Sequence, residues 1–211
     1  PISNEGVDLM LSGNIAHNKN TLESLGGRTV QADTRGRWQH HEGYELGSMW
    51  SKYIASAEYG PNNRLINVTC KGPKEQNFAP MPCPDAPFHY VGNPGPVWIG
   101  GANQTLTLGR SLILNATWVF NLDTRRYSTD QWARENTLQS SETAVARLQG
   151  LADPVFAAGM VTTDVEHQLM PRDDFVRLRE VSATYNLPDG MAGGFGLSRA
   201  SITMSGRTLF T

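Results

Sequence analysis

The sequence predicts a mainly β protein built on one antiparallel sheet of about seven strands, with one short helix in a long insert. Ser, Thr and Asn together are as numerous as Leu, Ile, Val and Phe, a mixture that suits strands with one polar and one apolar face. Only 18% of the residues are charged, and the 21 glycines and 12 prolines indicate many turns and few long helices. A chain of 211 residues is short enough for one domain, which we expect to span residues 1–211.

The first half of the chain alternates strand-like stretches with turns. Residues 7–18 have a period of two, and their apolar members share one face: Val7, Leu9, Leu11 and Ile15. Weaker extended stretches follow at residues 28–32, 44–54 and 64–70. Residues 71–96 hold most of the prolines, which have no N–H to donate to a ladder. We therefore expect an irregular Pro-rich loop at 71–96.

The second half contains the strongest hairpin signal. Residues 97–108 and 111–122 alternate on either side of a turn at Gly109 and Arg110. Four large side chains of the second strand are expected to form a buried sheet face, the core of the protein: Leu112, Leu114, Trp118 and Phe120. Two further strands are predicted at residues 174–187 and 199–209.

The period of two is lost in an insert at residues 123–171. Within it, Ser141 and Glu142 precede a short apolar pattern that ends at Gly150, as expected of a capped helix. The insert is therefore predicted to be a loop that contains one helix.

Cys70 and Cys83 are the two cysteines of the chain, and a short polar, Pro-rich segment separates them. Two cysteines that close a short irregular loop most economically form a disulfide in an oxidising compartment. The alternative is a pair of unrelated free thiols.

Charge and motifs exclude several classes of function. A net charge of -2 and a pI near 6.2 argue against nucleic-acid binding. No apolar run is long enough for a transmembrane helix, and the first residues lack the pattern of a secretion signal. His40, His41 and Glu42 lack a third metal ligand at a standard spacing. Because no catalytic motif accompanies the acids and the imidazole at residues 164–167, no enzyme and no cofactor are expected.

Two segments near the end carry a family resemblance. The stretch DDFVRLREVSATYNLP, followed by SRASITMSGRTLF, resembles the last strands of SusC/RagA-type TonB-dependent outer-membrane transporters. The segments VDLMLSGNIAHNKNTLESLGG, EGYELGSMW and YVGNPGPVWIGGANQTLTL are similar to strands of the same family. The resemblance implies that the sheet derives from a barrel segment. It also implies an ancestral role in energised uptake of glycans or peptides with a surface lipoprotein partner.

Charge in the strand at 175–186 bears on whether the sheet faces lipid. A strict period of two places Arg177 and Arg179 on one face and Glu180 on the other. Since charged residues on a lipid face are unfavourable, only the strand at 111–122 is expected to have a lipid-compatible face.

The first function hypothesis is a non-enzymatic accessory subunit in the periplasm, a transporter-derived fragment that docks on a membrane protein complex and stabilises it. A similar arrangement in bacterial photosynthetic reaction-centre–antenna complexes makes such a complex a possible partner. The candidate partner contacts lie in the insert: Arg125, Arg126, Tyr127 and Trp132. The alternatives are the C-terminal barrel strands of a SusC-like nutrient-uptake transporter, which would place the chain in the outer membrane, and a small stand-alone barrel.

Overall fold

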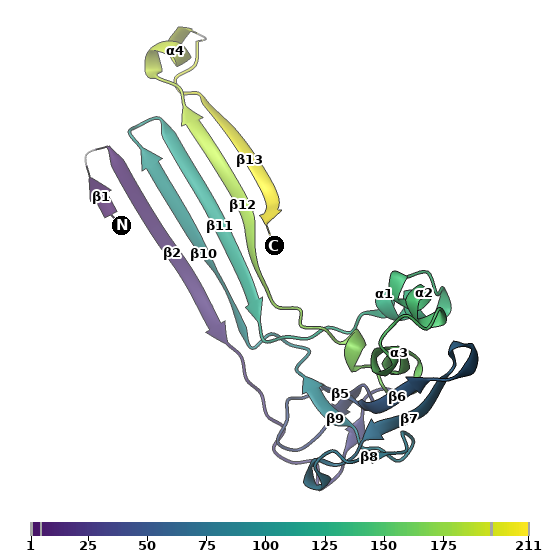
Figure 1. Ribbon diagram of the computed structural model, residues 1–211. Helices are drawn as coiled ribbons and strands as arrows, with labels where there is room; N and C mark the ends of the chain where they lie inside the picture. Colours follow the sequence, from purple (N-terminus) through teal and green to yellow (C-terminus); the bar gives the residue numbers. More distant parts are fainter. Residues whose placement is uncertain (1, 5, 195, 211) are drawn as a thin grey trace. The chain divides into compact units, whose positions relative to one another are not determined.

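Figure 1 shows a computed structural model of the chain, in which residues 2–4, 6–194 and 196–210 are described. Strands hold 42% of the residues and helices 19%, so the predicted mainly β class is confirmed. The contacts between residues divide the chain into two compact units. Unit 1 comprises residues 1–18, 96–123 and 174–211, and unit 2 comprises residues 19–95 and 124–173. The single domain expected over 1–211 stays a prediction about how the units fold together.

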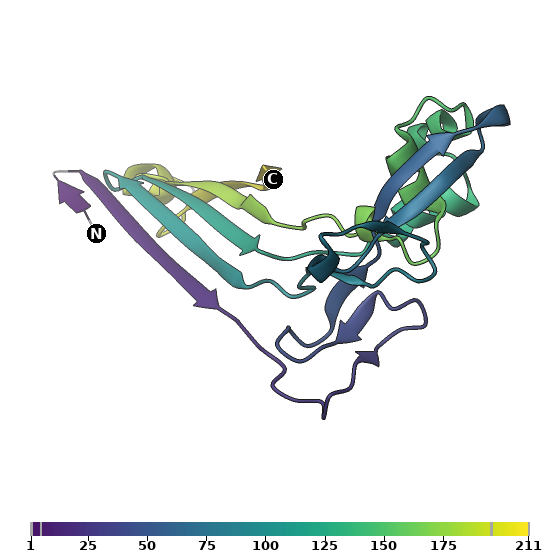
Figure 2. The same ribbon diagram turned by 60° about the horizontal axis from the view of Figure 1, so that its bottom comes forward.

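Unit 1 is an antiparallel sheet in the order β1-β2-β10-β11-β12-β13 (Figures 1 and 2). Its strands are β1 (Ile2–Asn4), β2 (Val7–His17), β10 (Trp98–Leu108), β11 (Leu112–Leu122), β12 (Phe175–Asn186) and β13 (Ser201–Phe210). Short turns connect β1 to β2 and β10 to β11, and a segment with helix α4 (Asp189–Gly194) connects β12 to β13. The five long strands predicted at 7–18, 97–108, 111–122, 174–187 and 199–209 are all present.

The β10–β11 hairpin has the register that the sequence pattern predicts. Leu108 lies opposite Leu112, and the pairing continues without interruption to Trp98 opposite Leu122. Gly109 in the turn has a φ of 59°, a left-handed conformation that glycine adopts at no steric cost. Its amide N–H also donates to the carbonyl of Gly6, which ties this turn to the β1–β2 turn.

A β-bulge at Arg179 corrects the expected facing of β12. Thr117 of β11 lies opposite Glu180, but the next residue, Trp118, lies opposite Leu178, so Arg179 is an extra residue in the ladder. A bulge shifts the alternation by one position. Val176 and Leu178 before it therefore share a face with the apolar residues after it, and the expectation that β12 carries charge on both faces is wrong.

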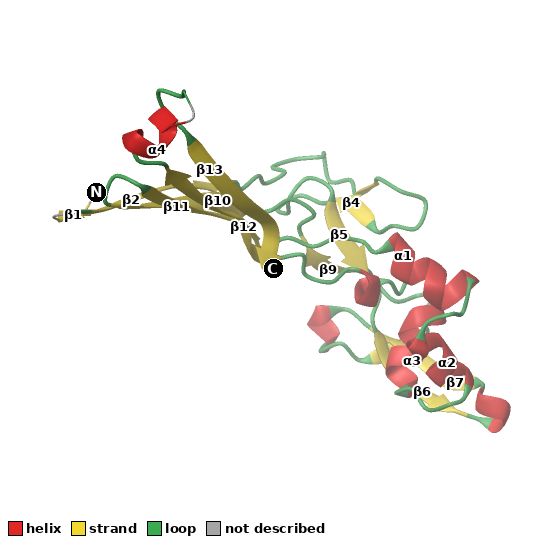
Figure 3. Ribbon diagram, turned by 90° about the horizontal axis from the view of Figure 1, so that it is seen from above, coloured by secondary structure: helices red, strands yellow, loops and turns green. Residues whose placement is uncertain are grey.

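The expected core of the sheet also needs correction. Leu112, Leu114, Trp118 and Phe120 share one face, as predicted, but each side chain is half-buried and none belongs to a buried cluster. The reason is that the described strands of unit 1 form one layer (Figure 3). A sheet face becomes a core only when a second layer covers it.

Unit 2 contains two smaller sheets and several short helices. The first sheet has the order β3-β4-β5-β9, and the second has the order β6-β7-β8. Their strands are β3 (Val30–Gln31), β4 (Trp38–His40), β5 (Ser48–Ser51), β9 (His89–Gly92), β6 (Ile54–Tyr59), β7 (Leu65–Lys71) and β8 (Pro80–Met81). The described residues thus form three sheets, where the sequence predicted one. Residues 71–96, expected to be irregular, contain two short strands, and Pro80 fits because β8 is an edge strand.

The insert expected at 123–171 is more helical than predicted. Its helices are α1 (Thr129–Trp132), α2 (Glu142–Leu148) and α3 (Pro154–Val161), with a π-helical turn at Ala133–Thr137. The predicted helix is α2. The Ser141 hydroxyl accepts a hydrogen bond from the Ala144 amide at 2.9 Å, and Gly150 follows the helix with a φ of 70°. The other helices lack a clear apolar period and were missed for that reason.

The buried core lies in unit 2. One cluster includes Ile54, Ala57, Ala158, Val165 and the disulfide between Cys70 and Cys83, and helix α3 packs against β6 and β7. A second cluster joins Met49, Val91 and Met170. The expected disulfide is therefore present and forms part of the core of this unit.

Candidate functional site

The most extensive functional feature of unit 1 is an apolar sheet face, here called the apolar face. Because residues opposite each other in antiparallel strands lie on the same side, the register assigns to it a side-chain row from each long strand. The rows are Val7, Leu9, Leu11 and Ile15; Ala102, Leu106 and Leu108; Leu112, Leu114, Ala116, Trp118 and Phe120; Val176, Leu178, Val181 and Ala183; and Ile202, Met204 and Phe210. Ile15 is 66% exposed and Met204 is 75% exposed. A continuous apolar surface of this kind marks a site of contact with lipid or protein.

Aromatic residues with a polar group lie at both ends of the apolar face. At one end Trp98 lies opposite His17 and Leu122, and the Trp98 and His17 ring centroids are 4.3 Å apart. At the other end Tyr185 lies opposite Leu112 and Ile202 and is 45% exposed. Trp and Tyr combine an apolar ring with a polar group, which suits the boundary between an apolar phase and water. Gln104 is a polar residue within the face.

The opposite face is mainly polar, and its side chains form cross-strand hydrogen bonds. The Thr105 hydroxyl donates to Asn115 Oδ1 at 2.8 Å, and Asn115 Nδ2 donates to the Ser182 hydroxyl at 3.4 Å. Further along, the Thr184 and Thr203 hydroxyls are 2.9 Å apart. An exposed ion pair joins Arg207 Nε to Glu180 Oε2 at 3.1 Å. The sheet is therefore apolar on one side and hydrogen-bonded and charged on the other.

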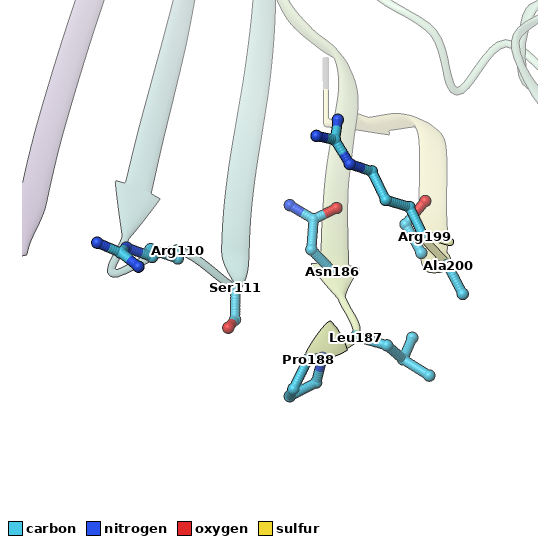
Figure 4. A pocket seen from close by; sticks show the side chains of 8 residues that line it. Arg110, Ser111, Asn186, Leu187, Pro188, Arg199 and Ala200 are labelled. Carbon is cyan, nitrogen blue, oxygen red and sulfur yellow. The ribbon is translucent and has the colours of Figure 1, made fainter. Parts of the chain in front are cut away.

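A pocket of about 650 Å³ is lined by the β10–β11 turn and by the two ends of the segment that connects β12 to β13 (Figure 4). Arg110, Asn186 and Arg199 are among its lining residues. Figure 4 shows the guanidinium groups of Arg110 and Arg199 well apart from each other. Because the two cations do not converge, the pocket does not form a single anion site.

The four candidate partner contacts of the insert lie in unit 2, and three of them take part in its internal packing. Arg125 Nη1 donates to the Met170 carbonyl at 2.9 Å. Tyr127 packs on the Met49, Val91 and Met170 cluster. The Arg35 guanidinium lies 5.1 Å from the ring centroid of Trp132. Arg126 is the most exposed and pairs with Asp173 at 2.8 Å. Their role toward a partner stays a prediction.

The acids and imidazole at residues 164–167 have structural partners. Arg35 Nη1 lies 3.1 Å from one oxygen of the buried Glu166, and Arg37 Nε lies 3.5 Å from the other. The Lys52 ammonium lies 3.5 Å from Asp164 and donates to the carbonyls of Cys83 and Pro84. These pairs join the chain segments 19–95 and 124–173 within unit 2. In the part of the chain that the structure describes, no group of three or more His, Cys, Asp or Glu side chains is arranged to hold a metal ion.

Within residues 2–4, 6–194 and 196–210, no helix has the length and apolar character that a membrane-spanning helix needs.

Comparison with known proteins gives a fold for the chain. No family model matches it, and no curated protein matches it. Among solved structures, the RagAB peptide importer in the closed-closed state matches with a TM-score of 0.73 at 16% identity, over 100% of this chain and 24% of that chain. The RagAB peptide transporter matches with a TM-score of 0.72 at 14% identity, over 100% of this chain and 24% of that one. The open-open state of the importer matches with a TM-score of 0.71 at 15% identity, over 99% of this chain and 23% of that one.

The chain therefore has the fold of a part of the RagAB transporter structures and spans about a quarter of the length of the chains it matches. This agrees with the SusC/RagA-type fold that the strand sequences resemble. The matched structures are those of a peptide importer or peptide transporter.

The full width of the apolar face does not follow from strict alternation along each strand. Alternation in β2 and β11 was visible, but the bulge at Arg179 concealed the apolar row of β12. The sequence signal for that row is a change of phase along the strand. The apolar residues have even numbers before Arg179 (Val176 and Leu178) and odd numbers after it (Val181 and Ala183). A phase change of one residue inside a long strand is what a bulge produces.

Proposed function

We propose that this chain forms part of the wall of a SusC/RagA-type outer-membrane transporter that takes up peptides or glycans. The apolar face would contact lipid, and the polar face would line the interior. The observation that carries this proposal is the continuous apolar face across five long strands, paired with a polar opposite face. Transmembrane β-strands alternate between lipid-facing apolar and interior polar residues in this way.

Three other features support the same proposal. The long strands have 10 to 12 residues, the length that a tilted strand needs to cross a bilayer. Short turns connect β1 to β2 and β10 to β11, whereas residues 18–97 and 123–174 provide long connections at the opposite strand ends. Outer-membrane strands are joined by short turns on the periplasmic side and longer loops outside. We therefore assign unit 2 to the extracellular side.

The test introduces an arginine on the apolar face and, in a second variant, on the polar face, at the same depth in the sheet. Ala102 and Asn103 are neighbours in the middle of β10, and Ala102 lies on the apolar face opposite Trp118, whereas Asn103 lies on the polar face. In a bilayer, Ala102→Arg should destabilise the folded chain by about 2–4 kcal/mol, and Asn103→Arg should have little effect. The measurement is urea-dependent unfolding, in phospholipid vesicles, of the complete transporter that carries each variant. Equal stability of the two variants would contradict a lipid-facing role for this face.

The accessory-subunit hypothesis is the second candidate, and it is favoured by the two edges of the open sheet. In the described residues β1 and β13 are edge strands, and exposed edges are covered by partners in stable assemblies. In this arrangement the chain would lie in the periplasm, its edges or apolar face would bind a membrane protein, and Arg125, Arg126, Tyr127 and Trp132 would add contacts. The matched peptide importers lend no support to a photosynthetic complex as that partner.

The remaining alternative, a small stand-alone barrel, does not agree with the sheet. A closed barrel needs its first and last strands to pair. In the described residues the sheet stays open between β1 and β13.

A further inference from the structure

Unit 2 contains a pocket of about 540 Å³, here called the aromatic pocket, whose size lies within the range of small-molecule sites. Strand β5, the end of β7, the loop after it and strand β9 contribute its lining. Seven of the lining residues have aromatic rings: Tyr44, Trp50, Tyr53, Phe78, Phe88, His89 and Tyr90.

The floor of the pocket is fixed by packing and hydrogen bonds. Trp50 is 6% exposed, and its indole N–H donates to the Ser48 hydroxyl at 2.8 Å. The ring of Tyr44 meets Trp50 edge-on with centroids 4.9 Å apart, and the Tyr90 centroid lies 5.8 Å from Trp50. The Tyr90 hydroxyl donates to Glu45 at 3.0 Å. These rings are held in place without a ligand, so binding would cost little ordering of the site.

The rim of the pocket includes a strained aromatic residue. Phe78 has a φ of 56°, in the left-handed region, and is 41% exposed. A bulky residue is rare in that region, and such strain is concentrated at functional sites. The loop is held in this conformation by hydrogen bonds from the Phe78 amide to the Pro73 carbonyl at 3.1 Å and from the Asn77 amide to the Lys74 carbonyl at 3.0 Å. The fold thus places an exposed ring where a solvated loop would favour a small or polar residue.

Charge at the rim selects the kind of ligand. Lys71 and Lys74 line the pocket together with one acid, Glu75, so its local charge is positive. Among the described residues, neither lysine forms an ion pair with a carboxylate, and the Lys71 ammonium lies 5.6 Å from the Tyr53 ring centroid. A cationic ligand would meet two ammonium groups, whereas a carboxylate would form charge-assisted hydrogen bonds with them.

From these contacts we infer that the aromatic pocket binds a small carboxylate that also carries a flat apolar group. The flat group would pack against the exposed rings of Tyr90 and Phe78, and the carboxylate would pair with Lys71 and Lys74. The inference concerns unit 2 alone and does not depend on the proposed role of the sheet.

The test uses N-acetyl-L-phenylalanine as the probe and isothermal titration calorimetry of the full chain as the measurement. Two matched probes separate the contributions of the ring and of the carboxylate. N-acetyl-L-phenylalanine amide keeps the ring and removes the charge, and acetate keeps the charge and removes the ring. We expect saturable binding of the acid, with the amide and acetate at least about tenfold weaker, a difference equivalent to roughly 1.4 kcal/mol. Equal affinity for the acid and the amide, or for the acid and acetate, would overturn the inference.

Two variants test the named residues. Phe78→Asn removes the ring but places at φ 56° a residue that tolerates the left-handed region, so the fold should keep its thermal stability. Lys74→Ala removes one rim cation, and Lys19→Ala is the matched control because Lys19 is exposed and does not line the pocket. We expect Phe78→Asn and Lys74→Ala each to weaken binding of the acid at least about fivefold, with Lys19→Ala unchanged. Unchanged affinity in Phe78→Asn, at unchanged thermal stability, would show that the pocket is not the site.

Discussion

His167 is a mostly buried imidazole in unit 2. Its ring stacks on Tyr53 with centroids 4.0 Å apart, and its Nδ1 has no hydrogen-bond partner among the described residues. Burial lowers the pKa of His167 to about 4, and the nearby cations Lys71 and Arg125 act in the same direction, although a hydrogen bond with the Lys52 backbone opposes them. The folded protein therefore keeps this imidazole neutral.

The pH dependence of stability follows from that shift. As the pH falls from 6.5 toward 4, the unfolded chain takes up a proton at His167 that the folded chain does not, so unfolding becomes more favourable. The loss amounts to roughly 1.4 kcal/mol per pH unit within that window. Urea unfolding of unit 2 at a series of pH values measures it, and His167→Gln should flatten the dependence between pH 6.5 and 4. An unchanged slope in the variant would assign the effect to other groups.

The residue types of Glu166 and His167 alone do not show whether the two side chains have a structural or a catalytic role. Glu166 and His167 are adjacent in the sequence, as acid–base residues can be, yet the buried Glu166 pairs with Arg35 and Arg37, and His167 packs on Tyr53. The partners of Glu166 are about 130 positions away in the chain, so no local pattern predicts them.

Among the strands, β10 shows how closely the sheet is packed. A Cβ atom at Gly100 would lie 2.6 Å from Cζ of Phe120 and would also clash with the Asn14 carbonyl. Phe120 of β11 is the residue opposite Gly100, so its ring covers the glycine. Gly100 is thus required by the aromatic ring on the neighbouring strand and by the close approach of β2.

This packing predicts that Gly100→Ala destabilises the sheet by about 1–3 kcal/mol, the usual effect of overpacking. Gly193→Ala in α4 is the matched control, because a Cβ there meets nothing within 4 Å. Urea unfolding in detergent compares the two variants. Adding Phe120→Leu to Gly100→Ala should recover part of the loss, and wild-type stability of Gly100→Ala would contradict the close packing.

The bulge in β12 explains why the prediction of charge on both faces of this strand was wrong. Strict alternation assigned its charges to both faces, because a bulge has no obligatory residue type in the sequence. Only the pairing of Trp118 with Leu178 after Thr117 with Glu180 reveals the extra residue. Arg177 and Glu180 then lie opposite Val119 and Thr117 on the polar face, which leaves the apolar face of β12 without charge.

At the scale of the whole molecule, the two units differ in what stabilises them. Unit 2 contains both buried clusters and the disulfide, whereas the described strands of unit 1 form a single layer. A disulfide that closes a loop of this size, with a sequence separation of 13, stabilises by about 3 kcal/mol in the chain-entropy model.

We therefore expect the double variant Cys70→Ser and Cys83→Ser to lower the stability of unit 2 and to leave unit 1 nearly unchanged. Hydrogen exchange followed by mass spectrometry of peptides distinguishes the units. Amides of β6 and β7 should lose protection, while those of β10 and β11 should keep it. Equal loss in both units would indicate that they unfold as one cooperative domain, in line with the single domain predicted over residues 1–211.

The mainly β class, the hairpin of β10 and β11 and helix α2 follow from the sequence, because alternation and capping residues are local signals, and the spacing of the two cysteines favours the disulfide over two free thiols. The sequence also carried the resemblance to SusC/RagA-type strands. Whether the Leu112, Leu114, Trp118 and Phe120 row forms a core depends on the tertiary structure, in which these side chains are half-buried on a face of the single-layered sheet. The physical reason is that alternation shows which residues share a side of a strand, whereas burial depends on whether another layer packs on that side.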